Sequence, residues 1–248
     1  EGELRHAVAR KEWLVYYQPI ISITSGEPVG AEALVRWRHP QRGILAPGEF
    51  IQVAEDTGLI VPIGEYVLRA ACQQAKAWRD AGYSTFWVSV NISARQFRNK
   101  DLVEMIARIL VETDLPSGGL RLEITESVAV QNTEYTIKIM NELDAMGVYT
   151  SLDDFGTGYS SLSYLKQFPL RVLKVDQSFI QDIQQNPKNE ALIKAIIGMA
   201  RSLGLEVVGE GVEKAEQLQF LRTQMCDQVQ GYLFSRPIPA EDLGKLLE

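Results

Sequence analysis

Two adjacent acidic residues, Asp153 and Asp154, are the first feature of the sequence that suggests chemistry. They follow an apolar stretch at 148–152 that is typical of a short strand, and Gly156 and Gly158 come soon after them. Adjacent side chains on a strand point to opposite faces, so both carboxylates can face one site only where the strand ends and turns. Such a pair suits two divalent cations, with one carboxylate bridging both. The alternative is a helix-capping aspartate beside a surface aspartate.

Other polar residues stand at or near the ends of further apolar stretches. Lys174, Glu123 and Glu32 each lie inside apolar sequence, where an ion costs several kcal/mol unless it is paired or bound to a metal. Core ion pairs account for one or two such residues, but not for seven strand ends in succession. The polar set along the chain is Glu32, Asn91, Glu123, Glu126, Asp153, Asp154, Lys174, Asp176, Glu210, Glu213 and Gln230.

The donor atoms in this set indicate hard cations. The chain has only two histidines, His6 and His39, and two cysteines far apart, which nearly excludes sites built on these residues. Oxygen donors without His or Cys suit Mg²⁺ or Mn²⁺ rather than zinc. Five carboxylates and an amide exceed what one magnesium takes from a protein. Two ions about 4 Å apart would use them, in the arrangement known for in-line attack on a phosphodiester. A lysine nearby would stabilise the phosphorane charge or orient the water.

The apolar pattern supplies strands and helices that can position these residues. Strands are predicted at 14–23, 31–37, 86–92, 120–124, 148–152, 171–175, 205–208 and 227–230. Amphipathic stretches between them predict helices at 62–81, from 99 onward, and at 132–146, 190–203 and 214–221, with a first helix reaching about Trp13. The first two strands, joined by a turn at 24–30, predict a hairpin.

The order of these elements predicts an α/β fold in one domain, residues 1–248. Strands that alternate with helices imply parallel pairing and right-handed crossovers. About eight strands in 248 residues is the size of a (β/α)₈ barrel. In such a barrel the carboxyl ends of the strands meet at one rim, so the polar residues would converge there. A doubly wound open sheet is the alternative.

Composition limits the class of protein. With 46% apolar and 23% charged residues the chain is ordinary globular material, and its net charge of −7 argues against a broad nucleic-acid surface. A small phosphate substrate fits nonetheless, because bound cations reverse the sign of an acidic pocket. No membrane span or signal peptide is found, and the cysteines suggest a reducing, cytoplasmic setting. The first residue is Glu rather than Met, which suggests a domain cut from a longer protein.

Seven motifs in order resemble those of the EAL domains, bacterial phosphodiesterases that open cyclic di-GMP to the linear dinucleotide pGpG. They are EALVRW at 32–37, the Asn of VSVNIS, EITE at 123–126, DDFGTGYSSL at 153–162, LKVD at 173–176, GEGVE at 209–213 and QGY at 230–232. The resemblance runs from about Leu14 to the C-terminus. It implies a modified, TIM-like (β/α)₈ barrel whose first strand is antiparallel to the others.

The resemblance also implies roles for individual residues, carried over by position. One metal ion would be held by Glu32, Asn91, Glu123 and Asp153, and the second by Asp153, Asp154 and Glu210. Lys174 would contact the attacking water or the scissile phosphate, and Gln230 would help to place that water, so the catalytic set is Glu32, Lys174, Glu210 and Gln230.

Substrate contacts follow from the same resemblance. Arg36 would bind a phosphate, while Gln18 and the Leu34 backbone would line the guanine and phosphate track. Asp176 is expected either in the site or as a helix cap, and Gln18 is alternatively a satisfied core amide. Glu126 and Glu213 would support the ligands from behind, with Glu126 holding the loop that follows Asp154.

With no departure at these positions, an active enzyme with two Mg²⁺ or Mn²⁺ ions is expected, and Ca²⁺ is expected to inhibit it. The alternative from another class is a non-hydrolysing receptor for cyclic di-GMP, and a barrel lyase or isomerase with one Mg²⁺ is a third. A homodimer through the helix after the diaspartate strand is expected, as are upstream sensory or GGDEF-type domains. The parent protein is compatible with membrane anchoring, but no membrane or nucleic-acid polymer contact is expected for this domain.

Overall fold

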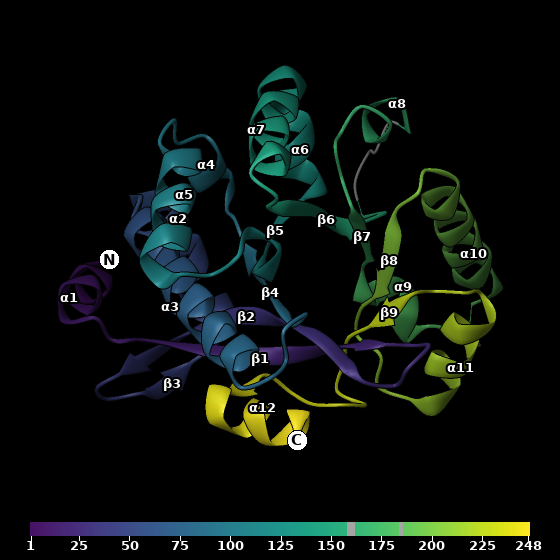
Figure 1. Ribbon diagram of the computed structural model, residues 1–248, viewed down its shortest axis with the longest axis horizontal. Helices are drawn as coiled ribbons and strands as arrows, with labels where there is room; N and C mark the ends of the chain where they lie inside the picture. The colour runs from purple at the N-terminus through teal and green to yellow at the C-terminus, as the bar shows by residue number, and fades with distance from the viewer. Residues whose placement is uncertain (158–161, 184–185) are drawn as a thin grey trace.

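Eight strands close into a barrel in the computed structural model, which describes residues 1–157, 162–183 and 186–248 (Figure 1). Within these residues the barrel strands are β1 (Trp13–Ser22), β2 (Pro28–His39), β4 (Trp87–Asn91), β5 (Leu120–Thr125), β6 (Tyr149–Phe155), β7 (Val172–Val175), β8 (Glu206–Gly209) and β9 (Gln228–Val229). Each corresponds to one of the eight predicted strands. Two short strands, β3 (Gly43–Leu45) and β10 (Ile238–Pro239), pair on the outer sides of β2 and β1.

Strand β1 runs antiparallel to both of its barrel neighbours, β2 and β9, whereas the other barrel strands pair in parallel. Because β1 pairs with both β2 and β9, the sheet closes on itself. This confirms the predicted TIM-like barrel with one antiparallel strand and excludes the open sheet. The predicted hairpin is present as well, and it sets Gln18 opposite Glu32.

Helices surround the barrel, with α3, α5 and α7 on one side and α10 and α11 on the other (Figure 1). The helices are α1 (Gly2–Arg10), α2 (Ile51–Thr57), α3 (Ile60–Asp80), α4 (Ala94–Phe97), α5 (Leu102–Thr113), α6 (Glu126–Gln131), α7 (Thr133–Ala145), α8 (Leu162–Leu165), α9 (Gln177–Gln181), α10 (Pro187–Ser202), α11 (Ala215–Thr223) and α12 (Ala240–Leu247). Each long helix buries one apolar stripe, as Ile63, Val67 and Ala71 do on α3. None of the helices in the described ranges is both long and apolar enough to cross a bilayer.

Several boundaries differ from the prediction for local reasons. The first helix ends at Arg10 rather than near Trp13, because Lys11 takes a left-handed conformation with φ of 53°. Strand β6 continues to Phe155 instead of ending at Leu152, since it carries a register irregularity between those residues. Helix α6, a short helix before α7, was not predicted. The loop predicted to follow Asp154 lies partly outside the described residues, at 158–161.

Strand β2 is longer than predicted, but only its first part belongs to the barrel wall. Residues Gly30–Ala33 pair with β4, and beyond Ala33 the strand continues outward in pairing with β1 and β3. Glu32 therefore stands at the end of the barrel although it lies in the middle of its strand.

The opposite end of the barrel is filled by side chains. The Trp87 ring lies under the Arg121 guanidinium, whose carbon is 3.7 Å from the ring centroid, and Trp87 packs with Ile20 and Val208. Gly30 leaves the space for this ring, because a Cβ there would collide with the indole. With this end closed, the polar interior residues face a single opening at the carboxyl ends of the parallel strands.

Candidate active site

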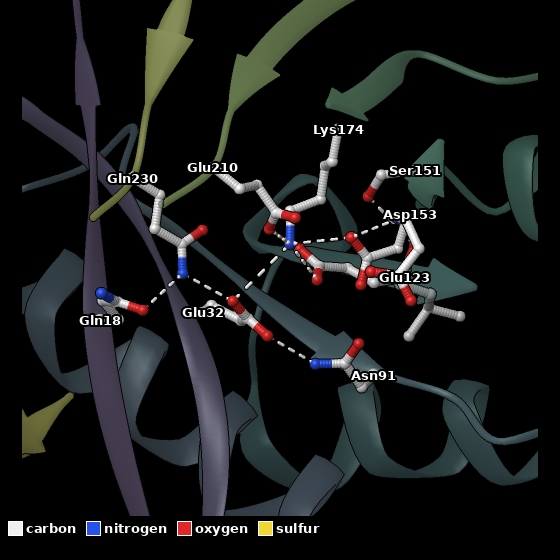
Figure 2. Close-up of polar contacts among 11 residues, drawn as sticks. Gln18, Glu32, Asn91, Glu123, Ser151, Asp153, Lys174, Glu210 and Gln230 are labelled. Atoms are coloured by element: carbon white, nitrogen blue, oxygen red, sulfur yellow. Dashed lines mark hydrogen bonds and ion pairs between the residues drawn. The ribbon is translucent and has the colours of Figure 1, made fainter. Parts of the chain in front are cut away.

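Four carboxylates surround one buried ammonium group, three of them on strands and the fourth directly after a strand (Figure 2). The Nζ of Lys174, on β7, lies 2.7 Å from both Glu123 on β5 and Glu210 after β8. It lies 3.5 Å from Asp153 on β6 and 3.6 Å from Glu32 on β2. Lys174 is only 1% exposed, so these contacts replace its hydration. The convergence of these strand ends on one rim, predicted from the sequence, is therefore present.

The electrostatics of the cluster show an excess of negative charge. Burial disfavours the ammonium of Lys174, but the surrounding carboxylates outweigh it and raise the pKa of Lys174 well above its ordinary value. Burial raises the pKa of Glu123 to about 8 despite the nearby Lys174. Burial likewise raises the pKa of Glu210 well above its ordinary value, against the opposing effect of Lys174. One ammonium therefore does not neutralise these acids, and further cations would stabilise their ionised forms.

Asp153 and Asp154 reach the same site because the backbone turns between them. Asp154 has a φ of 55°, in the left-handed region, and its N–H donates to Asp153 Oδ1 at 3.0 Å. One carboxylate oxygen from each of Asp153, Asp154 and Glu210 lies within 4.8 Å of the other two. Burial, followed by the charges of Asp153 and Asp176, raises the pKa of Asp154 to about 6. Three oxygens at this spacing fit a hard divalent cation.

The other side of the site is a chain of amides that ends at Glu32 (Figure 2). Asn91 Nδ2 and Gln230 Nε2 each donate to a different oxygen of Glu32, both at 2.6 Å. Gln230 Nε2 also donates to Gln18 Oε1 at 2.9 Å, and Gln18 Nε2 donates to the Ser235 carbonyl at 3.1 Å. The buried Gln230 Oε1 has no hydrogen-bond partner among the described residues, so it can accept from a water or contact a cation. Gln18 is both a satisfied buried amide and a site neighbour.

The remaining supporting residues lie as follows. The Glu126 carboxylate, at the start of α6, accepts from the Gly156 N–H at 3.3 Å and so ties down the segment after Asp154. Asp176 caps α9 by accepting from Ser178 N–H at 3.0 Å, and it also lines the site. Glu213 is exposed at the rim.

Two cavities of about 270 Å³ each meet at this cluster. The first contains the acids Asp153, Asp154 and Glu210 together with Gln230. The second is mostly apolar, and Asn91 and Glu123 are among its polar lining residues. Leu34 lines both cavities, and the acids of the cluster divide between them, with Glu123 in the second and the others in the first.

Arg36 lies two residues beyond Leu34 on the same face of β2. Its guanidinium carbon is 5.4 Å from the Tyr16 ring centroid, and its Nη1 donates to the Val35 carbonyl at 2.8 Å. Half-burial lowers its pKa, while Tyr16, Tyr232 and Glu32 act in the opposite direction. Arg36 is thus a cation at the mouth, near the acids but outside the lining of both cavities.

The EAL domain family model matches residues 1–237 of the chain. The chain belongs to the EAL domain family. It is 47% identical over 247 residues to the signaling protein YkoW of Bacillus subtilis. It is 44% identical over 241 residues to the bifunctional diguanylate cyclase/cyclic di-GMP phosphodiesterase MucR of Pseudomonas aeruginosa. These matches cover 100% and 97% of this chain but 31% and 35% of the two relatives, so the chain spans about a third of their length.

The fold of this EAL domain is also that of a solved structure. The structure titled "PaMucR Phosphodiesterase, c-di-GMP complex" matches with a TM-score of 0.95 at 44% identity, over 98% of each chain. The family resemblance inferred from the seven motifs is therefore confirmed.

Four residues of this EAL domain line the acidic cavity without having been predicted there: Gln177, Gly211, Gly231 and Tyr232. A sequence signal existed for Gly231 and Tyr232, which complete the QGY motif that was used for Gln230 alone, and for Gly211, which lies inside the GEGVE motif. Gln177 and Gly211 meet across a close contact between two loops, since a Cβ at Gly211 would collide with Gln177. Gln177 lies in no quoted motif, because its place in the lining depends on the packing of neighbouring strands.

Proposed function

We propose that this EAL domain hydrolyses cyclic di-GMP to linear pGpG with the help of two divalent cations, Mg²⁺ or Mn²⁺. The observation that carries the proposal is the gathering of Glu32, Glu123, Asp153 and Glu210 around the ammonium of Lys174, with Asp154 beside Asp153 and Glu210. The names of MucR and of the solved PaMucR complex support this substrate. We further propose that the domain works in the cytoplasm, within a longer protein.

The residues present fit two hard cations. Asp153, Asp154 and Glu210 would hold one, as their clustered oxygens suggest, and Glu32, Asn91, Glu123 and Asp153 would hold the other. When bound, such ions lower the pKa of water and stabilise negative charge on a phosphoryl group and its leaving oxygen.

The side chains around the carboxylates position the reacting groups. Asn91 and Gln230 fix Glu32 through both of its oxygens. The unpartnered Oε1 of Gln230 is suited to accept a hydrogen bond from the attacking water. Gln18 keeps Gln230 in this orientation through its own bond to the Ser235 carbonyl.

Lys174 and Glu210 divide the proton chemistry between them. Because its pKa is raised, Lys174 stays protonated and donates to the scissile phosphate, where it stabilises developing charge. Glu210 lies 2.7 Å from Lys174 Nζ, and burial raises its pKa well above the ordinary value, which makes the ionised carboxylate a stronger proton acceptor. Glu210 is therefore the acceptor that we propose for the proton of the attacking water.

Arg36, the cation at the mouth of the site, would contact a part of the substrate other than the reacting phosphodiester. Arg36 would bind a phosphate, and Leu34, which lines both cavities, would separate the two nucleotides. Asp176 lines the acidic cavity and would contact the same substrate.

Incubation with cyclic di-GMP and Mn²⁺, followed by chromatography, tests the function. We expect pGpG from the wild-type chain and no detectable product from Glu32→Ala or Asp153→Ala, with the far-UV circular dichroism of both variants unchanged. Glu134→Ala, an exposed acid on α7, serves as the control that keeps full activity. A wild-type chain that binds the dinucleotide and returns it uncut would be a receptor. Unchanged activity of either site variant in Mg²⁺ would remove the proposed site.

A further inference from the structure

Tyr232 is a large aromatic side chain that remains half-exposed at the wall of the acidic cavity. Its relative exposure is 49%, although it follows directly after the buried Gln230 and Gly231. The rest of that cavity is lined largely by carboxylates, amides and glycines. Catalysis by the acids does not require an aromatic ring here, and the ring has no role in the site described above.

The ring is supported from outside the cavity. The Arg236 guanidinium carbon lies 4.3 Å from the Tyr232 ring centroid, which is the geometry of a cation–π contact. Tyr232 lines the cavity, whereas Arg236 is not part of its lining. Arg236 therefore braces the ring and leaves its cavity side free.

The turn that carries the ring is fixed to the catalytic residues. The Gly231 carbonyl accepts from the N–H groups of Phe234 and Ser235, at 3.2 and 3.3 Å. The Ser235 carbonyl accepts from Gln18, which is hydrogen-bonded to Gln230. The ring is thus held in a set position relative to Gln230 and, through it, to Glu32.

The position of the Tyr232 ring depends on the absence of a side chain at Gly231. A Cβ at Gly231 would collide with the backbone of Val212, so the chain passes against the neighbouring loop with no side chain between them. The Val212 N–H donates to the Gln230 carbonyl at 3.0 Å, and Leu233 N–H donates to the Val212 carbonyl at 2.9 Å. The close approach of these two loops sets where Tyr232 leaves the wall.

The mouth beside Tyr232 carries positive charge, unlike the interior of the cavity. Arg36 stacks on Tyr16 at 5.4 Å, and Arg36 also interacts electrostatically with Tyr232. Tyr16 pairs with Pro239 of β10, close in sequence to Arg236. Two arginines and two tyrosines thus gather on one side of the mouth, a combination that suits an anionic group attached to a flat ring.

We propose that Tyr232, braced by Arg236, is the stacking platform for the purine base of the second nucleotide of the substrate, the one whose phosphodiester is not being cleaved. The proposal rests on the proposed function, because it requires a cyclic dinucleotide. The substrate is a closed macrocycle. When one of its phosphodiesters lies over the carboxylates, the other nucleotide therefore lies farther from the acids. An aromatic side chain stacks on any base, so Tyr232 would not select guanine over another base. Its expected contribution is to the binding affinity of the substrate and not to the cleavage reaction.

Steady-state kinetics with cyclic di-GMP test this role. We expect Tyr232→Ala to raise KM about 5- to 150-fold, the loss typical of one base–aromatic stack, while kcat stays within about twofold. Tyr232→Phe keeps the ring and should retain the wild-type KM. Arg236→Gln removes the brace alone and should raise KM about two- to fivefold. The matched control is Leu233→Ala, a half-exposed neighbour in the same turn that does not line the cavity and should leave both constants unchanged.

An unchanged KM in Tyr232→Ala, or an equal rise in Leu233→Ala, would overturn the platform and leave the proposed hydrolysis standing. Absence of hydrolysis by the wild-type chain would instead overturn the proposed function. Titration calorimetry of cyclic di-GMP with Ca²⁺ in place of Mg²⁺ separates the two cases. The same loss of affinity in Tyr232→Ala, with none in Tyr232→Phe, supports the platform even without turnover, and equal affinities for all variants overturn it.

Discussion

One residue of the candidate site, Lys174, is charged and almost completely buried. Lys174 is 1% exposed, yet it contacts carboxylates from four different barrel positions. Removing one partner of a buried charge is costly, whereas an ammonium with several hydrogen-bonded partners is stable. The lysine therefore holds the acids of separate strands at one point, and the remaining negative charge favours the uptake of divalent cations.

The pH dependence of the metal requirement is expected to follow Asp154. Its pKa rises from the ordinary 3.8 to about 6 through burial and the charges of Asp153 and Asp176. Below pH 6 the folded chain therefore holds a proton that a cation must displace. Asp154 should by itself raise the Mg²⁺ concentration for half-maximal hydrolysis about tenfold for each pH unit below 6, in addition to the displacement of protons from Glu123 and Glu210 that begins at higher pH.

The raised pKa of Asp154 also determines the direction in which the free energy of unfolding changes with pH. The folded chain binds more protons than the unfolded chain between pH 3.8 and about 6, so the metal-free chain should lose stability as pH rises through this window.

Activity titrations with Mg²⁺ at pH 5, 6 and 7 measure the metal requirement. Equal half-maximal concentrations at all three would contradict the role given to Asp154.

At the level of elements, strand β6 and helix α6 act together. The irregularity in β6 and the left-handed Asp154 bring two adjacent carboxylates to one side. Such a backbone conformation is costly for a residue other than glycine and persists only when its surroundings hold it. Glu126, which is 4% exposed at the start of α6, helps to stabilise this conformation because its carboxylate accepts a hydrogen bond from the Gly156 N–H.

Removal of this support should weaken metal binding more than catalysis itself. For Glu126→Ala we expect the Mg²⁺ concentration for half-maximal activity to rise about tenfold or more, because residues that orient metal ligands carry effects of this size. Activity should recover largely at saturating Mg²⁺. Glu126→Gln retains an oxygen acceptor for Gly156 and should lose less. The prediction is wrong if Glu126→Ala has the wild-type metal requirement.

At the scale of the whole molecule, the closed barrel separates a packed end from a reactive end. Trp87 and Arg121 fill one end, and the acids stand at the other. Alternate residues of a barrel strand face the interior, so Trp87 and Asn91, at opposite ends of β4, both point inward, Trp87 into the packing and Asn91 into the site. Closure of the barrel is thus a condition for the geometry of the site.

Gly30→Ala should disturb the packed end directly. The added methyl group would collide with the Trp87 ring, and overpacking of this kind costs about 1–3 kcal/mol of unfolding free energy. Gly198→Ala is the matched control, because Gly198 is an exposed position on α10 with no neighbouring atom in the way, and it should gain about 0.5–1 kcal/mol. Urea unfolding monitored by tryptophan fluorescence measures both. Equal stability of the two variants would contradict this account of the barrel end.

The homodimer expected from the family resemblance stays a prediction for the whole molecule. Light scattering at micromolar concentration should give about twice the chain mass of 27.8 kDa. A mass of one chain under these conditions would count against it.

Much of this arrangement could be predicted from local patterns. The strands and the long helices follow from apolar periodicity, and the acids at the strand ends follow from the rule for parallel barrels. The end of β6 and the short α6 could not be predicted in the same way. They depend on how β6 pairs with β7 and on where Glu126 meets the backbone of Gly156, and both are contacts between distant segments.

The sequence alone determined the family, the barrel class and the types of donor atom at the site, because periodicity and residue chemistry are properties of short segments. Only the tertiary structure decided that Lys174 contacts four acids, that Gln230 Oε1 finds no hydrogen-bond partner among the described residues and that Tyr232 lines the acidic cavity. Distances between strands depend on closure and register, and these are set by packing over the whole chain rather than by any one motif.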